Sequence, residues 1–260
     1  MINSQNVAQT GSQAYVDQGL RQYMLKVYNY MAGGLCITAL ISYLIANTSA
    51  IKLFFTVAPN GAVGMSGLSW LALLAPFIMI FAFGWVLSRG TLAQVQGVYW
   101  GYAAVMGAAL APVFIAYTGT SITRIFLITA AMFGGMSLYG YTTRKDLTSM
   151  GSFMTMGLWG IIIAMIVNIF LKSPGLYYAL SILSVVVFTG LTAYDTQKIR
   201  AIYAESDSGD MSSRKAISGA LALYMDIINL LFFRRFFIDF SFLFRYKATC
   251  PRPFLNKRLK

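Results

Sequence analysis

Histidine is absent from the 260 residues of this sequence, and cysteine occurs only twice. The lack of an imidazole excludes histidine-ligated metal sites and a Ser-His hydrolase. Two cysteines, Cys36 and Cys250, do not make a disulfide framework. Charged residues are also scarce, at 11% against about 25% in soluble domains. Together with a hydrophobic share of 58%, this scarcity predicts an integral membrane protein, a single helix bundle in lipid.

Positive charge exceeds negative charge, and the formal net charge is +12. Such a balance can indicate a nucleic-acid partner. Here, however, the lysines and arginines gather at the ends of apolar segments and in the last 27 residues. Cationic segments placed in this way meet anionic lipid. We therefore predict the lipid bilayer as the partner, and no nucleic acid.

Apolar segments long enough to cross a membrane recur along the chain. About 20 mostly apolar residues are needed to cross a hydrocarbon core ~30 Å thick. Ile51–Ala58 is too short for this and is predicted to be interfacial. Seven segments qualify and predict an all-α membrane protein with seven transmembrane helices: Val27–Ala46, Leu68–Leu87, Val95–Tyr117, Ile122–Tyr141, Met150–Leu171, a sixth from Gly175 and a seventh from Ala216.

The predicted seven-helix domain covers residues 21–246. Residues 1–20 form a polar N-terminal tail before it, and residues 247–260 form a basic C-terminal tail after it. A polar start followed by a long apolar segment is typical of a signal anchor rather than a cleaved signal peptide.

Lysines and arginines favour alternate connections between the spans. One set carries Arg89, Arg144 and Lys198 among others, whereas the opposite set carries only Lys52 and Lys172. Short loops rich in positive charge stay in the cytoplasm. The sequence therefore predicts a multi-pass protein of the inner (plasma) membrane with a cytoplasmic N-terminus. Seven crossings would export the basic C-terminal tail, so the side on which this tail lies is left open.

Small residues recur through the third span. Gly97, Gly101 and Gly107 are spaced along it with alanines between and beyond them. Small side chains let helix backbones approach closely in lipid, where packing replaces the hydrophobic effect. We expect these three glycines at contacts between helices.

Two of the eight acidic residues lie clearly within apolar spans, Asp195 in the sixth and Asp226 in the seventh. A carboxylate in the bilayer is costly and usually faces a partner or a water path. If helix six ends near Glu205 and helix seven begins near Lys215, both carboxylates lie ~15 Å from that end, at 1.5 Å per residue. They would then be level. Two carboxylates so close do not both ionise easily, so they would share a proton.

Once deprotonated, such a pair is a di-anionic site suited to a hard cation, here calcium bound transiently by Asp195 and Asp226. Lys198 and Asn229 are predicted as supporting residues, because each follows one aspartate by three positions. A structural alternative stays open, in which Asp195 pairs locally with Lys198, and Asp226 is satisfied by Asn229 or a tyrosine. Catalysis is a further alternative.

Longer motifs carry a family resemblance. They are Ala193–Ile199 (Ala-Tyr-Asp-Thr-Gln-Lys-Ile), Ala220–Leu230 (Ala-Leu-Ala-Leu-Tyr-Met-Asp-Ile-Ile-Asn-Leu) and, in the middle of the chain, Pro112–Ile122 and Phe133–Gly151. These motifs resemble the Bax inhibitor-1 family, the transmembrane Bax inhibitor motif proteins, over Tyr23–Arg245, and the chain is similar to its bacterial members.

This resemblance implies a fold of six helices wrapped around a central, hydrophobic seventh. It implies a pH-sensitive calcium-leak channel rather than an enzyme, with calcium as the transported ion, protons as the regulator and no cofactor. The family's pH-sensing centre is an aspartate pair on helices six and seven, which matches Asp195 and Asp226. In the family, an arginine on the second helix can latch onto this pair in the closed state, and Arg89 is the arginine near that span.

Three other function classes are compatible with parts of the sequence. One alternative is a non-transporting regulator that binds other membrane proteins, since some bacterial members of the family interact with a membrane-bound protease. Paired aspartates on membrane helices also suggest an intramembrane aspartyl protease. The Gly-x-Gly-Asp half of that signature is absent, because Asp226 follows Leu223–Met225. A retinal protein would need a lysine in its seventh span, and Ala216–Phe233 has none.

Overall fold

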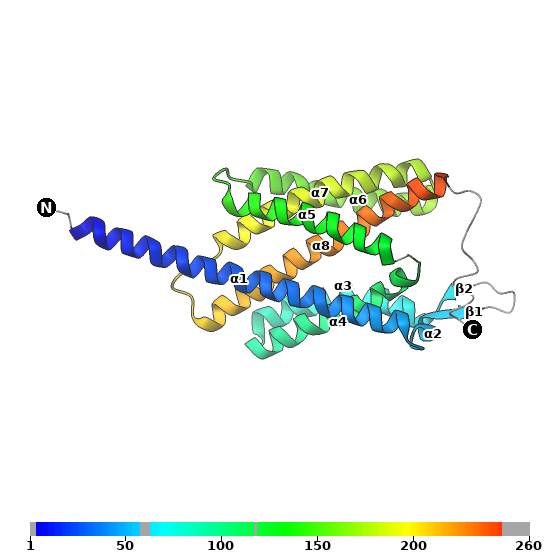
Figure 1. The fold of residues 1–260 in the computed structure, drawn as a ribbon, viewed down its shortest axis with the longest axis horizontal. Coiled ribbons are helices and arrows are strands. Elements are labelled where there is room, and N and C mark those ends of the chain that lie inside the picture. Colours follow the sequence, from blue (N-terminus) through cyan, green and yellow to red (C-terminus); the bar gives the residue numbers. More distant parts are fainter. Residues whose placement is uncertain (1–3, 58–62, 117–118, 246–260) are drawn as a thin grey trace.

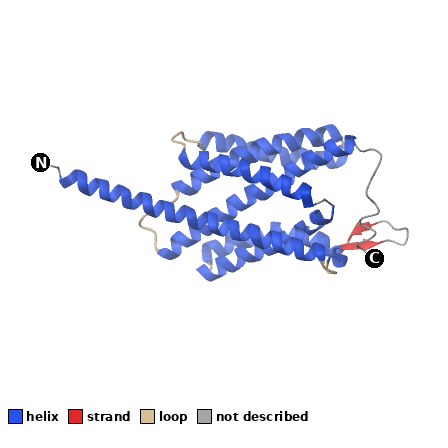
Figure 2. Cartoon of the chain, in the orientation of Figure 1, coloured by secondary structure: helices blue, strands red, loops and turns tan. Residues whose placement is uncertain are grey.

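The computed structural model describes residues 4–57, 63–116 and 119–245, with side chains described for residues 18–54, 66–111 and 122–231. Helices dominate this part of the chain, apart from one small antiparallel pair of strands, β1 (Phe55–Val57) and β2 (Val63–Met65) (Figure 2). The helices are α1 (Ser4–Asn47), α2 (Ile51–Phe54), α3 (Gly67–Arg89), α4 (Leu92–Ala116), α5 (Gly119–Thr142), α6 (Thr148–Leu171), α7 (Pro174–Ala201) and α8 (Gly209–Arg245).

Several of these helices are suited to lipid. Even α3, with 23 residues, extends ~35 Å at 1.5 Å per residue, which exceeds a hydrocarbon core of ~30 Å. Within the described residues, five stretches are long and apolar enough to cross a membrane: Gln18–Asn47 in α1, α3, Ile122–Thr142 in α5, α6 and α7. Outward-facing side chains such as Phe81 and Phe170 are 80% exposed, which suits a lipid environment. The predicted helical membrane class is confirmed, while the count of seven crossings goes beyond these five.

The long helices form two groups that α8 joins. In one group α4 packs against α1 and α3, and in the other α7 packs against α5 and α6. Helix α8 contacts both groups, through α1 and α4 on one side and α5 and α7 on the other. Figure 1 shows α8 running obliquely between the two groups, with the N-terminal part of α1 projecting beyond the bundle.

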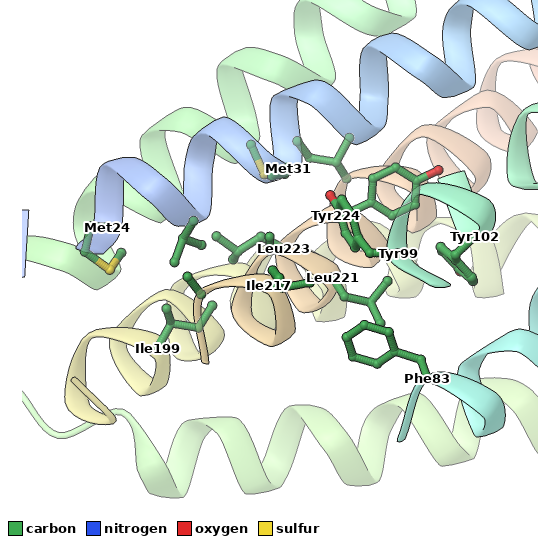
Figure 3. Packing of buried hydrophobic residues seen from close by; sticks show 14 of the residues in the cluster. Met24, Met31, Phe83, Tyr99, Tyr102, Ile199, Ile217, Leu221, Leu223 and Tyr224 are labelled. Carbon is green, nitrogen blue, oxygen red and sulfur yellow. The ribbon is translucent and has the colours of Figure 1, made fainter. Parts of the chain in front are cut away.

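The main buried cluster lies where α8 meets α1 and α4 (Figure 3). Ile217, Leu223 and Tyr224 of α8 have no exposed surface, and neither do Val27 of α1 and Tyr99 of α4. A helix buried on so many sides needs apolar residues all round. Between residues 216 and 231, every position of α8 except Ser218, Asp226 and Asn229 is apolar, glycine or tyrosine, which meets most of that need.

Polar side chains on the seam between α1 and α4 are paired with each other or with backbone. The Tyr224 hydroxyl lies 2.6 Å from Thr38 Oγ1, which donates to the Ala103 carbonyl at 2.8 Å. Ser42 donates to the Gly107 carbonyl at 2.6 Å. Such internal pairing is required where lipid offers no hydrogen bonds.

The turn between α6 and α7 is tight and carries a single cation. Lys172 ends α6 in the left-handed conformation, with φ of 49°. The Asn168 side chain accepts from the Ser173 amide at 3.1 Å. Ser173 caps α7, and Pro174 occupies its first turn, where its fixed φ suits a helix start. The turn thereby holds the Lys172 backbone at one end of the bundle, with the side chain exposed.

The structure gives regular secondary structure to two segments outside the predicted spans. Helix α1 begins at Ser4, so most of the predicted polar tail of residues 1–20 is helical. No proline interrupts the sequence between residues 4 and 47, so nothing there stops the helix. The predicted interfacial segment, residues 51–58, forms α2 and β1 as far as Val57. The predicted basic tail, residues 247–260, lies outside the described residues.

The ends of the α7–α8 hairpin also differ from expectation. Helix α7 ends at Ala201 rather than Glu205. Tyr203 lies beyond that end and packs on Tyr23 of α1, with ring centroids 5.4 Å apart. An apolar residue that seemed to continue the helix therefore serves a tertiary contact instead.

Helix α8 begins at Gly209, not near Lys215. Counted from these ends, Asp195 lies ~9 Å and Asp226 ~25 Å along its helix, at 1.5 Å per residue. The figure of ~15 Å from each assumed helix end was therefore wrong, because both helix ends differ from those assumed.

The three glycines of α4 differ in their surroundings. A Cβ built at Gly107 would lie 2.8 Å from the Thr38 carbonyl oxygen of α1. At Gly101 it would meet only Met79 Cε of α3, at 3.3 Å. At Gly97 it would meet no heavy atom within 4 Å. The close contact expected at Gly97 is not formed, because Gly97 lies on an exposed face of α4, whereas its neighbours Gln96 and Tyr99 contact Tyr30 of α1.

We predict opposite effects for the same substitution at two of these glycines. Gly107→Ala should lower the melting temperature in detergent, since its Cβ meets a backbone oxygen, and overpacking costs about 1–3 kcal/mol. Gly97→Ala is the matched control on the same helix. It should leave stability unchanged or raise it, since alanine is a better helix former than glycine by roughly 0.5–1 kcal/mol. Equal melting temperatures for the two variants would contradict the packing described for Gly107.

Candidate functional site

Asp226 is a buried acidic side chain of α8, whereas Asp210 of the same helix is exposed. Asp226 is 5% exposed, and its Oδ2 atom has no hydrogen-bond partner among the described residues. A buried polar atom without a partner costs about 1–3 kcal/mol. Native proteins keep few such atoms, and those that persist often mark function.

Asp195 lies on the helix that packs along α8. It is half-buried on α7. Its carboxylate is the charged group that acts electrostatically on Asp226. The two aspartates singled out from the sequence therefore lie on adjacent helices, α7 and α8.

Lys198 is exposed and stands one turn beyond Asp195. Its ammonium lies 6.0 Å from the centre of the Tyr194 ring, at the limit of a cation–π contact. The positive charge of the Lys198 ammonium interacts electrostatically with the Asp195 carboxylate. Within the described part of the chain, the ion pair closer than 4 Å is Lys215–Asp207, so the local Asp195–Lys198 pair of the structural alternative is not formed.

The other two predicted supporting residues are not partners of the aspartates. Asn229 is half-buried and lines a cavity beside α8, and Asp226 Oδ2 receives no hydrogen bond from it. Arg89 is exposed at the end of α3 and, among the described residues, forms no ion pair with either aspartate.

Small residues bring neighbouring backbones close to the Asp195 segment. A Cβ on Gly140 of α5 would collide with the backbone of Ala193, and one on Gly151 of α6 would collide with the Tyr194 ring. These approaches hold α5 and α6 tightly against α7. Sequence reasoning missed both glycines, because their partners are more than forty residues away.

A buried chain of hydroxyl groups joins three helices next to Asp195. The Tyr28 hydroxyl of α1 lies 2.6 Å from Ser137 Oγ of α5. Ser137 Oγ lies 3.0 Å from Thr196 Oγ1 of α7, which donates to the Thr192 carbonyl at 2.8 Å. Each hydroxyl is thereby satisfied, and the polar chain fixes the register of α1, α5 and α7 beside the aspartate segment.

Basic side chains fasten helix ends at the end of the bundle where α3, α5 and α7 finish. Arg214 of α8 donates to the Leu87 carbonyl at 3.1 Å and to the Gly90 carbonyl. Arg200 donates to the Tyr141 carbonyl at 2.7 Å. These carbonyls lie at helix C-termini, which favour cations. The sequence marked these arginines only as loop charges, since their acceptors are backbone atoms of other helices.

The connection between α5 and α6 is tied to α7 at the same end. Gln197 accepts from the Leu147 amide and donates to the Lys145 carbonyl, both at 2.8 Å. Within this connection Asp146 accepts hydrogen bonds from the side chain and backbone of Thr148, which hold the pKa of its carboxyl below the ordinary value.

The described residues contain no group of three or more His, Cys, Asp or Glu side chains that could hold a metal ion. Calcium needs about six to eight oxygen ligands, and two aspartates supply at most four. A calcium ion at these two aspartates would therefore keep several water ligands, as a weakly bound, transported ion does.

A cavity of about 900 Å³ opens beside the aspartate helix, between the two helix groups. Helices α3 and α4 form one wall, α6 and the start of α7 form the other, and Met225, Ile228 and Asn229 of α8 form the floor. The floor residues flank Asp226 in the sequence.

Comparison with known proteins gives consistent results. The family model described as "Inhibitor of apoptosis-promoting Bax1" matches residues 20–241. The protein called inner membrane protein YbhL of Escherichia coli is 43% identical over 215 residues, 82% of this chain and 88% of that protein. A Rickettsia prowazekii protein is 42% identical over 221 residues, 85% and 90% of the two chains. A Caulobacter vibrioides protein is 41% identical over 218 residues, 83% and 87% of the two chains.

We predict that Arg214 keeps the end of α3 closed. In Arg214→Gln, amide hydrogen exchange in the last turn of α3 should speed up about tenfold or more, because hydrogen bonds from a charged donor contribute ~1.5–3 kcal/mol. The measurement is hydrogen-exchange mass spectrometry of the protein in detergent. Arg144→Gln, at an exposed arginine, is the control and should leave that peptide unchanged. Identical exchange in all three proteins would show that the contact does not hold α3.

Proposed function

The chain belongs to the Bax inhibitor-1 family, and from that premise we propose that it is a pH-sensitive calcium-leak channel of the inner membrane, gated by Asp195 and Asp226. The observation that carries the proposal is the buried Asp226 carboxylate, whose Oδ2 lacks a partner in the part of the chain with described side chains and whose charged neighbour is a second carboxylate. The proposal assigns the protein no catalytic activity and no cofactor.

The gating step follows from the charge of the pair. At low pH one shared proton lets the two carboxylates stay together and holds α7 against α8. As pH rises, the proton leaves, and two negative charges face each other where the dielectric constant is low. Separation of the helices, approach of a basic residue or entry of a cation relieves this repulsion. Opening and calcium entry are therefore linked to deprotonation.

The supporting residues have distinct roles in this scheme. Lys198, near the cytoplasmic end of α7, moderates the charge of Asp195, while Asn229 supplies an amide on the cavity side of α8. Arg89 can act as a latch only if the end of α3 moves inward, since its side chain is exposed in this structure. Calcium is cargo that passes the pair.

The proposed topology has seven crossings, with six helices around a central α8. Two findings support it: α8 contacts four helices from both groups, and YbhL, to which the chain is similar, is by name an inner membrane protein. The N-terminus is cytoplasmic in this proposal, because Arg144, Lys145, Arg200 and Arg214 lie near the ends of α3, α5 and α7, which share one end of the bundle (Figure 1).

We predict that either single aspartate substitution removes the pH dependence of calcium flux. The measurement is calcium entry into liposomes that contain the purified protein, across a pH series. In the wild type, flux should rise with pH, by up to about tenfold per unit for linkage to one proton. Asp195→Asn and Asp226→Asn should flatten this profile whatever leak remains, whereas Asp195→Glu should shift it.

The matched control is Asp210→Asn, which removes an exposed carboxylate from the first turn of α8 and should leave the profile unchanged. A wild-type profile in Asp226→Asn would mean that the pair is structural. No calcium flux through the wild-type protein at any pH would favour the alternative function, a non-transporting regulator that binds other membrane proteins.

A further inference from the structure

We propose that the cavity between the two helix groups is a binding site for one acyl chain of a phospholipid with an anionic headgroup, held at its mouth by Lys172. This site is separate from the aspartate pair, and the proposal does not depend on calcium transport.

The size and lining of the cavity fit an apolar ligand. Its volume of about 900 Å³ lies in the range of roughly 300–1,000 Å³ typical of small-molecule sites. Leu73, Phe77 and Ile80 of α3 face Met165 and Ile169 of α6 across it. Two of the helices that line the cavity, α3 and α6, are apolar enough to cross a membrane, so acyl chains are the apolar ligands at hand.

The depth of the cavity matches one leaflet. Along α6 it is lined from Met165 to Lys172, which covers ~10 Å at 1.5 Å per residue. Half of a hydrocarbon core ~30 Å thick is ~15 Å. Lys172 ends its helix at the bundle end opposite the arginine contacts, and Met165 lies inside the span. The cavity therefore extends from headgroup level toward the middle of the bilayer, as one acyl chain does.

The charge at the mouth selects the headgroup. Lys172 is exposed, lines the cavity and is held in place by the tight turn before α7. Asn168 is occupied by the Ser173 amide. An ammonium at headgroup level attracts anionic lipid. The occupant is thus a lipid with a net negative headgroup, such as phosphatidylglycerol.

A buried residue at the floor of the cavity can report whether a lipid chain is bound inside it. Ile228 of α8 is 3% exposed and lines the cavity. A lipid in the bulk bilayer cannot contact Ile228, whereas a chain inside the cavity lies against it. Labelling of this segment therefore separates a bound lipid from the surrounding lipid.

The experiment uses the full-length protein in liposomes that contain phosphatidylglycerol with a photoreactive group in its acyl chain. After illumination, the labelled peptides are identified by mass spectrometry. In the wild type, we expect labelling in the α8 segment from Met225 to Asn229, in addition to the outward faces of α3 and α6. Ala109→Phe fills the cavity from α4 and should reduce α8 labelling about tenfold, which corresponds to a loss of ~1.4 kcal/mol.

Two matched controls and a charge variant complete the design. Ala82→Phe adds the same ring at an exposed position of α3 outside the cavity lining and should leave α8 labelling unchanged. Lys172→Gln should lower it about threefold, as expected for one exposed ion pair. Lys52→Gln, at another exposed lysine of the same bundle end, should have no effect.

Two outcomes would overturn the proposal. The first is an unlabelled α8 in the wild type while the outward faces are labelled, which does not depend on whether any variant folds. The second is a dimer of the wild-type chain that Ala109→Phe dissociates with no change in lipid labelling, which would assign the cavity to a second copy of this chain. Equal labelling with a phosphatidylcholine probe, unaffected by Lys172→Gln, would remove the anionic headgroup from the proposal.

Discussion

The structure depends on one constraint, the burial of a carboxylate in a helix that is enclosed by other helices. Asp226 is buried, its Oδ2 has no partner among the described residues, and its charged neighbour, Asp195, carries the same sign when ionised. Leaving one oxygen of a buried side chain without a partner costs about 1–3 kcal/mol, and more when the group is charged. The surrounding helices must therefore offset that cost through packing, which explains why contacts near this point are so close.

Two features pack the helices around this region. Small residues let helices approach each other next to Asp195, and Arg214 holds a helix end far from it. Gly140 and Gly151 let α5 and α6 approach the segment before Asp195, and the hydroxyl chain from Tyr28 to Thr196 satisfies the polar groups beside it. Arg214 fastens the end of α3 to the start of α8. Since α8 joins two helix groups that otherwise share few contacts, a change of charge at Asp226 acts where both groups meet.

Features set by neighbouring residues could be predicted from the sequence. Contacts between residues far apart in the sequence could not. Apolar runs predicted the helical membrane class, and the motifs around Asp195 and Asp226 predicted the family, which the comparisons confirm. Tyr203 looked like a continuation of helix α7, because its contact with Tyr23 of α1 leaves no trace in the local pattern. Spacing alone could not tell Gly107, which packs on α1, from Gly97, which meets nothing. The arginine contacts were missed for the same reason, since backbone carbonyls carry no sequence signature.

In the proposed mechanism a proton and a cation compete for the same pair of carboxylates, and proton release measures this competition most directly. Binding a metal to a protonated carboxylate site releases protons. Calcium added to the purified protein in weakly buffered detergent solution at mildly acidic pH should release protons, detected with a pH indicator. The account predicts release in the wild type and in Asp210→Asn, and none in Asp195→Asn or Asp226→Asn. Equal proton release from Asp226→Asn, or none from the wild type at any pH, would contradict it.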